Sequence, residues 1–234
     1  MTADFILLLK IKIQYVSINL EQFERILGMK IITISREFGS GGRELGKRMA
    51  DVLGFDYYDS EIISAVAQKS GLDASYIESV LDNHGWQDIP ISFSGSIGSV
   101  GYVNSSAVNL LIQQKKVIEE IAALGKDCII VGRNADVILS DYNPFSVFVC
   151  ASMDAKVNRC MQRAKNKEEL TQKELAKKIK QIDKMRAKTR TVLSGQNWGE
   201  RHDYNLTVNT TDWEIKELAT LVSQFADAWF KREK

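Results

Sequence analysis

The chain has 234 residues, a formal net charge of +1, two histidines and three cysteines. This length accommodates one α/β domain with a full core, or one with a small insertion. A balanced charge provides no overall field for nucleic acid or an anionic membrane, so neither partner is expected. The cysteines, Cys128, Cys150 and Cys160, form no C-x-x-C pair. Their spacing is typical of reduced thiols in a cytoplasmic protein, and excludes a zinc ribbon or a disulfide framework.

Residues 1–28 are expected to be an N-terminal extension of uncertain role, followed by one domain over residues 29–234. The apolar run from Phe5 to Leu9 follows Asp4 and is interrupted by Lys10 and Lys12. A run this short and this charged predicts neither a signal peptide nor a membrane span. Because every candidate functional residue lies after it, the function is not expected to depend on it.

The segment 29–54 is the one around which the rest of the chain is arranged. β-Branched residues at 31–34 predict a strand that is buried on both faces. A glycine-rich turn at 39–42 follows, and then apolar residues recur at helical spacing until Gly54 ends the helix. A strand, a glycine loop and a helix in this order direct backbone N–H groups and a positive helix end at a phosphate. An ordinary βα turn is the competing interpretation.

This glycine loop departs from a standard phosphate-binding loop. A literal G-x-x-x-x-G-K match ends at Lys47, but Arg48 follows it instead of Ser or Thr, and helical geometry places Lys47 on the solvent side. In the alternative register the loop runs from 36 to 42, and the phosphate-facing lysine position is Gly42. Guanidinium groups on both sides of the glycines can replace the lysine. The expected phosphate ligands are Arg36, Gly39, Ser40, Gly41, Gly42 and Arg43.

Four more short apolar runs predict strands at 55–59, 128–131, 145–150 and 204–208. Helical patterns follow the second strand, cover 108–124 and 156–190, and close the chain between 213 and 229, with Asp212 as the expected N-cap of the last helix. Residues 85–106 are rich in glycine and serine and show no helical period. Such a stretch indicates either a functional or mobile loop, or a disordered insertion.

Polar residues stand at the carboxyl ends of two predicted strands, which is where open α/β sheets bind ligands. Asp59 ends the second strand, and Gly132-Arg133-Asn134 follows the third. A guanidinium is suited to bidentate contact with a phosphate, so Arg133 is a candidate phosphate ligand. The alternatives are a helix-capping role for Asp59 and a surface salt bridge for Arg133.

The segment 156–190 carries 13 Lys or Arg against 4 Asp or Glu. Arg159 and Arg163 are four residues apart, so they lie on one helix face. Arginines on a mobile hairpin are what phosphoryl transfer requires, because the negative charge of the transferred group must be neutralised. The competing interpretation is a solvated basic helix. Asp183 and Arg186, three residues apart, also share a face, and a simple intrahelical ion pair would explain them equally well.

Several segments together resemble the cytidylate kinase-like family, whose relatives are the P-loop kinases that phosphorylate CMP and dCMP. They are SREFGSGGRELGKRMADVLG from Ser35, FDYYDSEII from Phe55, CIIVGRNADVIL from Cys128 and, later in the chain, IKQIDKMR, SGQNWGE and YNLTVNT. The resemblance implies ATP and Mg²⁺ as cofactors and small-molecule nucleotides as partners. It implies ATP phosphate binding at the glycine loop, and acceptor binding by Asp59, Arg133, Asn134, Asp183 and Arg186. Arg43, Arg159 and Arg163 are then the expected catalytic residues, and the metal ligands stay open.

The expected fold is a P-loop NTPase-type three-layer α/β/α domain with a mostly parallel five-stranded sheet, an acceptor flap at about 60–125 and a lid at about 156–190. Two functions are compatible with these observations. The first is an ATP-dependent phosphotransferase that acts on a nucleoside monophosphate such as CMP or dCMP. The second is a non-catalytic nucleotide-binding or regulatory protein on the same fold, which Gly42 at the lysine position favours.

Overall fold

The computed structural model describes residues 28–71, 74, 105–163 and 171–232. Within this part of the chain one sheet contains β1 (Ile31–Arg36), β2 (Asp56–Tyr58), β3 (Cys128–Val131), β4 (Phe145–Cys150) and β5 (Leu206–Asn209). The strand order is β2-β3-β1-β4-β5, and every neighbouring pair is parallel. Each predicted strand overlaps an observed one, so the expected P-loop-type parallel sheet is confirmed.

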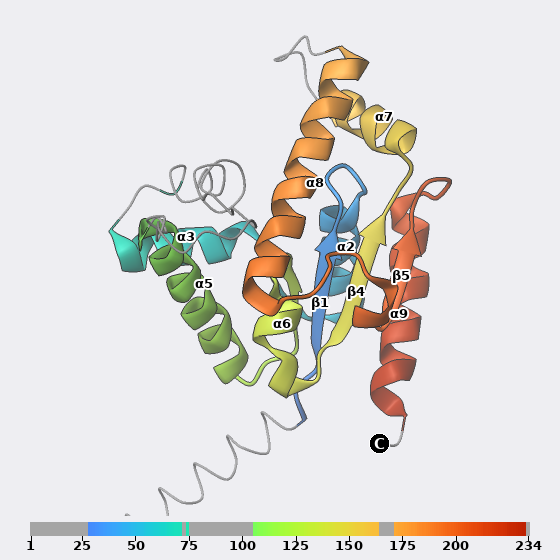
Figure 1. Ribbon diagram of the computed structural model, residues 1–234. Coiled ribbons are helices and arrows are strands. Elements are labelled where there is room, and N and C mark those ends of the chain that lie inside the picture. Colours follow the sequence, from blue (N-terminus) through green and yellow to red (C-terminus); the bar gives the residue numbers. More distant parts are fainter. Residues whose placement is uncertain (1–27, 72–73, 75–104, 164–170, 233–234) are drawn as a thin grey trace, which may run out of the picture.

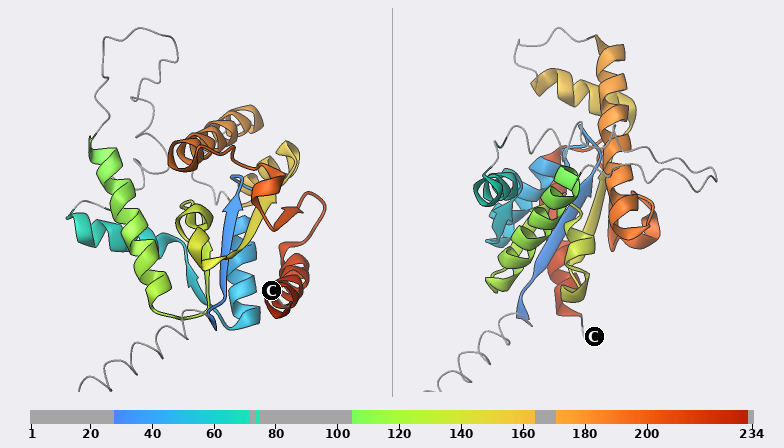
Figure 2. Two further views of the ribbon diagram at one scale, coloured as in Figure 1. Left: turned by 60° about the horizontal axis from the view of Figure 1, so that its bottom comes forward. Right: turned by 60° about the vertical axis from the view of Figure 1, so that its left-hand side comes forward.

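Helices cover both faces of the sheet (Figure 1). One layer consists of α2 (Gly42–Leu53) and α9 (Ile215–Lys231), which pack side by side (Figure 2). The other contains α3 (Ser60–Ser70), α5 (Ser105–Ala123), α6 (Ala135–Ile138) and part of α8 (Gln172–Ser194). Helix α7 (Met153–Arg163) follows β4 and contacts α8. The described residues also include two short 3₁₀ helices, η2 (Ser140–Tyr142) and η3 (Arg201–Asp203).

The hydrophobic residues of β1 alternate between two cores. Ile31 is buried on the side of α3, α5 and α6, whereas Ile32 and Ile34 are buried against α2 and α9. Burial of one such side chain contributes about 1.5–3 kcal/mol to the free energy of folding. Because both faces of β1 are covered by helices, apolar residues stabilise the fold on both of them. The central position of β1 places the glycine loop that follows it in the middle of the sheet's carboxyl edge, below α7 and the upper part of α8 (Figure 1).

The last helix begins later in the chain than expected. Asp212 does not cap the last helix: α9 begins at Ile215 with Glu214 at the N-cap position. The reason is a turn before the helix, in which the Trp213 N–H donates to the Thr210 carbonyl.

Most of the expected flap loop, residues 85–104, lies outside the described residues. None of the described helices combines the length and the apolar composition that crossing a membrane requires.

Candidate functional site

The glycine loop between β1 and α2 depends on its glycines. Gly39 and Gly41 have φ angles of 78° and 85°, which side chains with a Cβ rarely adopt. A Cβ on Gly39 would lie 2.9 Å from Cys160 Sγ, and one on Gly41 would lie 2.6 Å from Ile215 Cδ1. The loop is therefore packed tightly against α7 on one side and α9 on the other, and its backbone is held in a left-handed turn.

The first turn of α2 has the geometry that favours binding of an anion. Gly41 is the N-cap of the helix and no described side chain caps it. The N–H groups of the first turn therefore point out of the helix end, where the helix dipole is positive. Ser40, an expected phosphate ligand, has a fully buried side chain whose hydroxyl donates to the Glu37 carbonyl at 2.8 Å. Its hydroxyl thus faces the interior of the loop.

Arg36 explains why a lysine is missing from the helix start. A Cβ on Gly42 would lie 2.5 Å from the Cβ of Arg36, so the Arg36 side chain occupies the space beside Gly42. It then continues to the turn after β3, where a Cβ on Gly132 would lie 1.5 Å from Arg36 Nη1. Its guanidinium ends 3.6 Å from the carboxylate of Asp59. The positive charge expected at the loop is therefore supplied by Arg36, the last residue of β1.

Asp59 is placed beside the loop by the end of β2 and is 4% exposed. Its carboxylate forms ion pairs with both Arg36 and Arg43. It is also the N-cap residue of α3, as the capping alternative supposed, although its side chain makes no cap hydrogen bond. Two guanidinium groups that share one carboxylate leave an excess of positive charge at the mouth of the loop.

The segment after β3 has an unusual backbone. Gly132, Arg133 and Asn134 have φ angles of 74°, 61° and 53°, so three successive residues are left-handed. This conformation costs energy for residues other than glycine and is concentrated at functional sites. The Arg133 carbonyl accepts a hydrogen bond from Gln114 Nε2 at 3.2 Å, which ties the turn to α5.

Two pockets lie side by side at this edge of the sheet. The glycine-loop pocket is lined by Arg36, Glu37, Phe38, Gly39, Gly41, Gly42, Arg43, Cys160, Arg163, Leu175, Lys178 and Arg186. The Arg133 pocket is lined by Ser35, Arg36, Leu111, Gln114, Gly132, Arg133, Asn134, Arg186, Thr189 and Trp198. Arg36 and Arg186 belong to both, so two guanidinium groups lie where the pockets meet.

Asp183 and Arg186 of α8 both contact the segment that begins the glycine loop. One carboxylate oxygen of Asp183 accepts the Phe38 N–H at 2.7 Å, and the other lies 3.3 Å from Lys156 Nζ. Arg186 donates to the Arg36 carbonyl at 2.9 Å, and lies 3.9 Å from Asp183. The intrahelical ion pair is thus present, and Asp183 is directed at the glycine loop while Arg186 lines both pockets.

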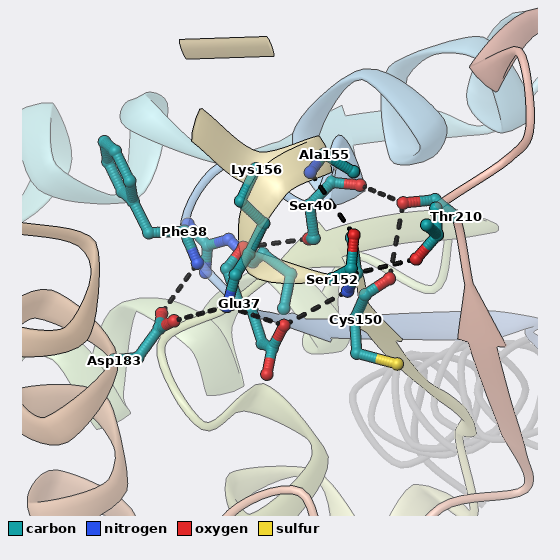
Figure 3. A network of polar contacts seen from close by, with 12 residues as sticks. Glu37, Phe38, Ser40, Cys150, Ser152, Ala155, Lys156, Asp183 and Thr210 are labelled. Atoms are coloured by element: carbon teal, nitrogen blue, oxygen red, sulfur yellow. Dashed lines mark hydrogen bonds and ion pairs between the residues drawn. The ribbon is translucent and has the colours of Figure 1, made fainter. Parts of the chain in front are cut away.

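Lys156 joins this network and was missed in the sequence (Figure 3). It is 4% exposed, and its Nζ lies 3.0 Å from Glu37 Oε2, which also accepts the Ala151 N–H at 3.1 Å. Burial raises the pKa of Asp183, while the hydrogen bond from the Phe38 N–H and the charge of Lys156 act in the opposite direction. No local sequence pattern indicates this cluster, because Lys156 is one of many lysines in a basic segment.

The two arginines of α7 differ in their contacts. Arg159 donates to the Thr210 carbonyl, to the Thr210 hydroxyl at 3.0 Å and to the Ser40 carbonyl at 3.4 Å. Burial lowers its pKa first, and the nearby charge of Arg163 lowers it further. Arg159 therefore links the glycine loop to the segment that follows β5. Arg163 forms an ion pair with Glu44, is more than half exposed and lines the glycine-loop pocket.

A further polar pocket lies between α7 and the start of α9. Arg159 and Arg163 line it together with Trp213, whose side chain was not singled out from the sequence. Trp213 is 47% exposed, which is high for a tryptophan. Among the described residues no group of three His, Cys, Asp or Glu side chains is arranged to hold a metal ion.

Solved structures of other proteins share the fold of this chain. An uncharacterized protein from Eubacterium ventriosum superimposes with a TM-score of 0.61 at 23% identity, covering 86% of this chain and 99% of its own. A shikimate kinase from Bacteroides thetaiotaomicron gives a TM-score of 0.51 at 14% identity, with 85% and 99% coverage. The shikimate kinase from Acinetobacter baumannii in complex with shikimate gives 0.51 at 14%, with 87% and 96% coverage. At these identities the likeness shows the fold alone.

No curated protein matches the chain in sequence. The family model of the cytidylate kinase-like family, however, matches residues 31–212, which include the glycine loop, both pockets and α7. That match extends over most of the chain and contains all the segments that carried the resemblance. The chain therefore belongs to the cytidylate kinase-like family.

Proposed function

We propose that this protein is an ATP-dependent phosphotransferase that acts on a nucleoside monophosphate such as CMP or dCMP. The observation that carries the proposal is that the glycine-loop pocket and the Arg133 pocket share Arg36 and Arg186. A phosphoryl group that passes from one pocket to the other lies beside both guanidinium groups. Fixed positive charge at that place stabilises the transition state, because the transferred group carries its charge on its outer oxygens.

On the donor side, the phosphates of ATP bind at the start of α2. The N–H groups of its first turn provide the backbone donors, as at other helix ends that bind anions. Arg36 and Arg43 flank them, and Arg163 reaches the same pocket from α7. Arg159 acts through the loop, because its guanidinium is bound to Thr210 and to the Ser40 carbonyl. We thus assign Arg159 to positioning the loop and Arg163 to contact with the phosphates.

On the acceptor side, Arg133 and Asn134 present the ligand-binding turn, and Arg36 and Arg186 complete the pocket. Asp59 is held between two arginines next to it. The position of Asp183 supports a different role from acceptor binding, since its carboxylate holds the Phe38 N–H and Lys156. We assign Asp183 to fixing the glycine loop, so recognition of the acceptor depends on the other residues.

Mg²⁺ is the metal that membership of a kinase-like family implies. The described residues of the glycine-loop pocket do not fit it as a protein-held ion, because their one carboxylate, Glu37, is bound to Lys156 and the Ala151 N–H. We derive no step through the metal. Gly42 at the lysine position still favours a second function, a nucleotide-binding protein without phosphoryl transfer.

The two functions differ in turnover. The test offers CMP, dCMP, UMP, AMP and shikimate, each with ATP and Mg²⁺, and measures ADP formation above the rate without acceptor. We expect turnover with CMP or dCMP. If none of the five acceptors raises the rate while ATP still binds, the phosphotransferase proposal fails and the binding function stands.

Single substitutions test which pocket binds the donor and which binds the acceptor. Arg163→Ala is expected to lower kcat by at least about 10²-fold, comparable to the loss of one preorganised charge-stabilising donor. Arg133→Ala is expected to raise the KM for the acceptor with less effect on the KM for ATP. Arg201→Ala removes an exposed arginine outside both pockets and serves as the matched control with unchanged kinetics. Equal loss in all three variants would contradict the assignment.

A further inference from the structure

The second residue of α2 differs from that of a standard phosphate-binding loop. There the helix opens with lysine, followed by Ser or Thr, whose hydroxyl binds the Mg²⁺ of the nucleotide. In this chain α2 opens with Gly42, and the next residue is Arg43. A guanidinium has no lone pair to offer a metal and repels one by its charge. The usual protein ligand for the metal is thus replaced by a cation.

The glycine-loop pocket as a whole is strongly cationic. Five of its lining residues carry a positive charge, against the single carboxylate of Glu37. The five are Arg36, Arg43, Arg163, Lys178 and Arg186. Such a lining attracts the unchelated polyphosphate, which carries more negative charge than its complex with a divalent cation. It opposes the approach of the metal itself.

The hydroxyl groups near the loop do not replace the missing Ser or Thr as a ligand for the metal. Ser40 and Thr210 are fully buried, and their hydroxyls donate to the Glu37 carbonyl at 2.8 Å and to the Ser40 carbonyl at 2.6 Å. Neither reaches the pocket, and neither lines it. Because Mg²⁺ is bound through oxygen ligands, the described part of the loop provides no place to hold it.

Arg43 is placed to bind the phosphates in place of Mg²⁺. Its side chain is 61% exposed, but Nε is anchored by an ion pair with the buried carboxylate of Asp59. The anchor restricts the rotation of the guanidinium, and Arg43 lines the glycine-loop pocket. Two parallel N–H donors in a fixed plane match the oxygens of a phosphate.

We infer that this chain binds the polyphosphate of its nucleotide without a divalent metal ion, and that Arg43 supplies the neutralising charge that a loop-bound Mg²⁺ supplies elsewhere. The inference rests on the proposed donor site at the glycine loop. It concerns binding, and it names the preferred ligand as the metal-free nucleoside triphosphate. A protein that takes this form of ATP has an affinity that Mg²⁺ does not improve.

The test measures the Kd of ATP by calorimetry at equal ionic strength, once with EDTA and once with excess Mg²⁺. For the wild-type chain we expect the affinity with EDTA to equal or exceed the affinity with Mg²⁺. Arg43→Ser places a hydroxyl at the metal-binding position. This variant is expected to lose at least about tenfold in affinity with EDTA and less with Mg²⁺, because a removed charge weakens binding of the free polyphosphate most. Lys47→Ser, on the same helix but paired with Asp51, is the control without effect.

The outcomes separate this inference from the proposed function. Binding of ATP by the wild type that needs Mg²⁺ would overturn the inference and leave the donor site intact. Absence of ATP binding in both conditions would overturn both. The comparison on the wild type alone requires no variant, and inorganic pyrophosphate with and without Mg²⁺ repeats it with the phosphates only. Tighter binding of the metal complex of pyrophosphate would also contradict the inference.

Discussion

The side chain of Arg36 restricts which residues the chain can carry at two other positions. It passes beside Gly42 and ends against Gly132, and an added Cβ at either glycine would collide with it. At Gly42 the nearest atom is the Cβ of Arg36, which is close to the backbone and cannot move aside. These three positions therefore form one packing unit, although they lie on three different elements.

This unit gives a prediction at the level of single residues. Gly42→Lys, which restores the standard lysine, is expected to weaken ATP binding and lower stability by about 1–3 kcal/mol, because it overpacks the space that Arg36 fills. Arg36→Gly together with Gly42→Lys reproduces both features of a standard loop and is expected to recover much of the stability. Urea denaturation and ATP calorimetry on the single and double variants measure the coupling. Purely additive effects would show that the two side chains do not compete.

At the level of elements, the contact between the glycine loop and the α7–α8 pair depends on buried charges. Lys156 from α7 lies between Glu37 of the loop and Asp183 of α8, and all three are largely buried. Asp183 also holds the Phe38 N–H, so the loop backbone is tied directly to α8. A buried charge that loses its partner is costly, whereas an intact pair adds little net stability.

Lys156→Met is expected to lower the free energy of unfolding by about 3–5 kcal/mol, because it removes the cation that lies between two largely buried carboxylates. Adding Asp183→Asn removes one of these charges while keeping an acceptor for the Phe38 N–H, so part of the loss is expected to return. Lys184→Met on the exposed side of α8 is the control, with a change within about 0.5 kcal/mol. Denaturation curves for the four chains provide the measurement. A loss in Lys156→Met no larger than in the control would argue against a clamping role.

The elements themselves were largely predictable, and their mutual contacts were not. A strand such as 128–131 is encoded by its own apolar residues, and the left-handed turn of Gly132, Arg133 and Asn134 follows it directly. The bonds of Lys156 to Glu37 and of Asp183 to Phe38 join residues 119 and 145 positions apart. Nothing in the local pattern of either partner marks such a contact. The resemblance implies an acceptor role for Asp183, and its contacts with Phe38 and Lys156 are visible only in the structure.

On the scale of the whole molecule, β1 is the centre of the sheet and has a parallel neighbour on each side. The two cores meet along it, and every residue of both pockets lies after Met29. The sequence predicted this arrangement because strand, glycine loop and helix follow one another within 26 residues, from 29 to 54. Which residues line the pockets could not be predicted from the sequence, since α7 and α8 contribute residues that are distant along the chain.

A chain that begins at Met29 is therefore expected to fold and to bind ATP as the full chain does. The reason is that both hydrogen-bonding edges of β1 are already occupied by β3 and β4. Thermal melting with and without ATP compares the two chains. A fall in the melting temperature of more than about 5 °C, equivalent to roughly 1–2 kcal/mol for a protein of this size, would show that residues 1–28 contribute to the fold.

The path of Arg36 also affects how relatives of this protein can be recognised. A search that requires a lysine at the start of the first helix would overlook any chain in which an arginine at the end of the first strand fills that space. The steric relation provides a different signature: an arginine six positions before a glycine that opens the helix, combined with a glycine directly after the third strand. An arginine at the first position and a lysine at the second would exclude one another, so the two kinds of loop should divide sequences into separate groups.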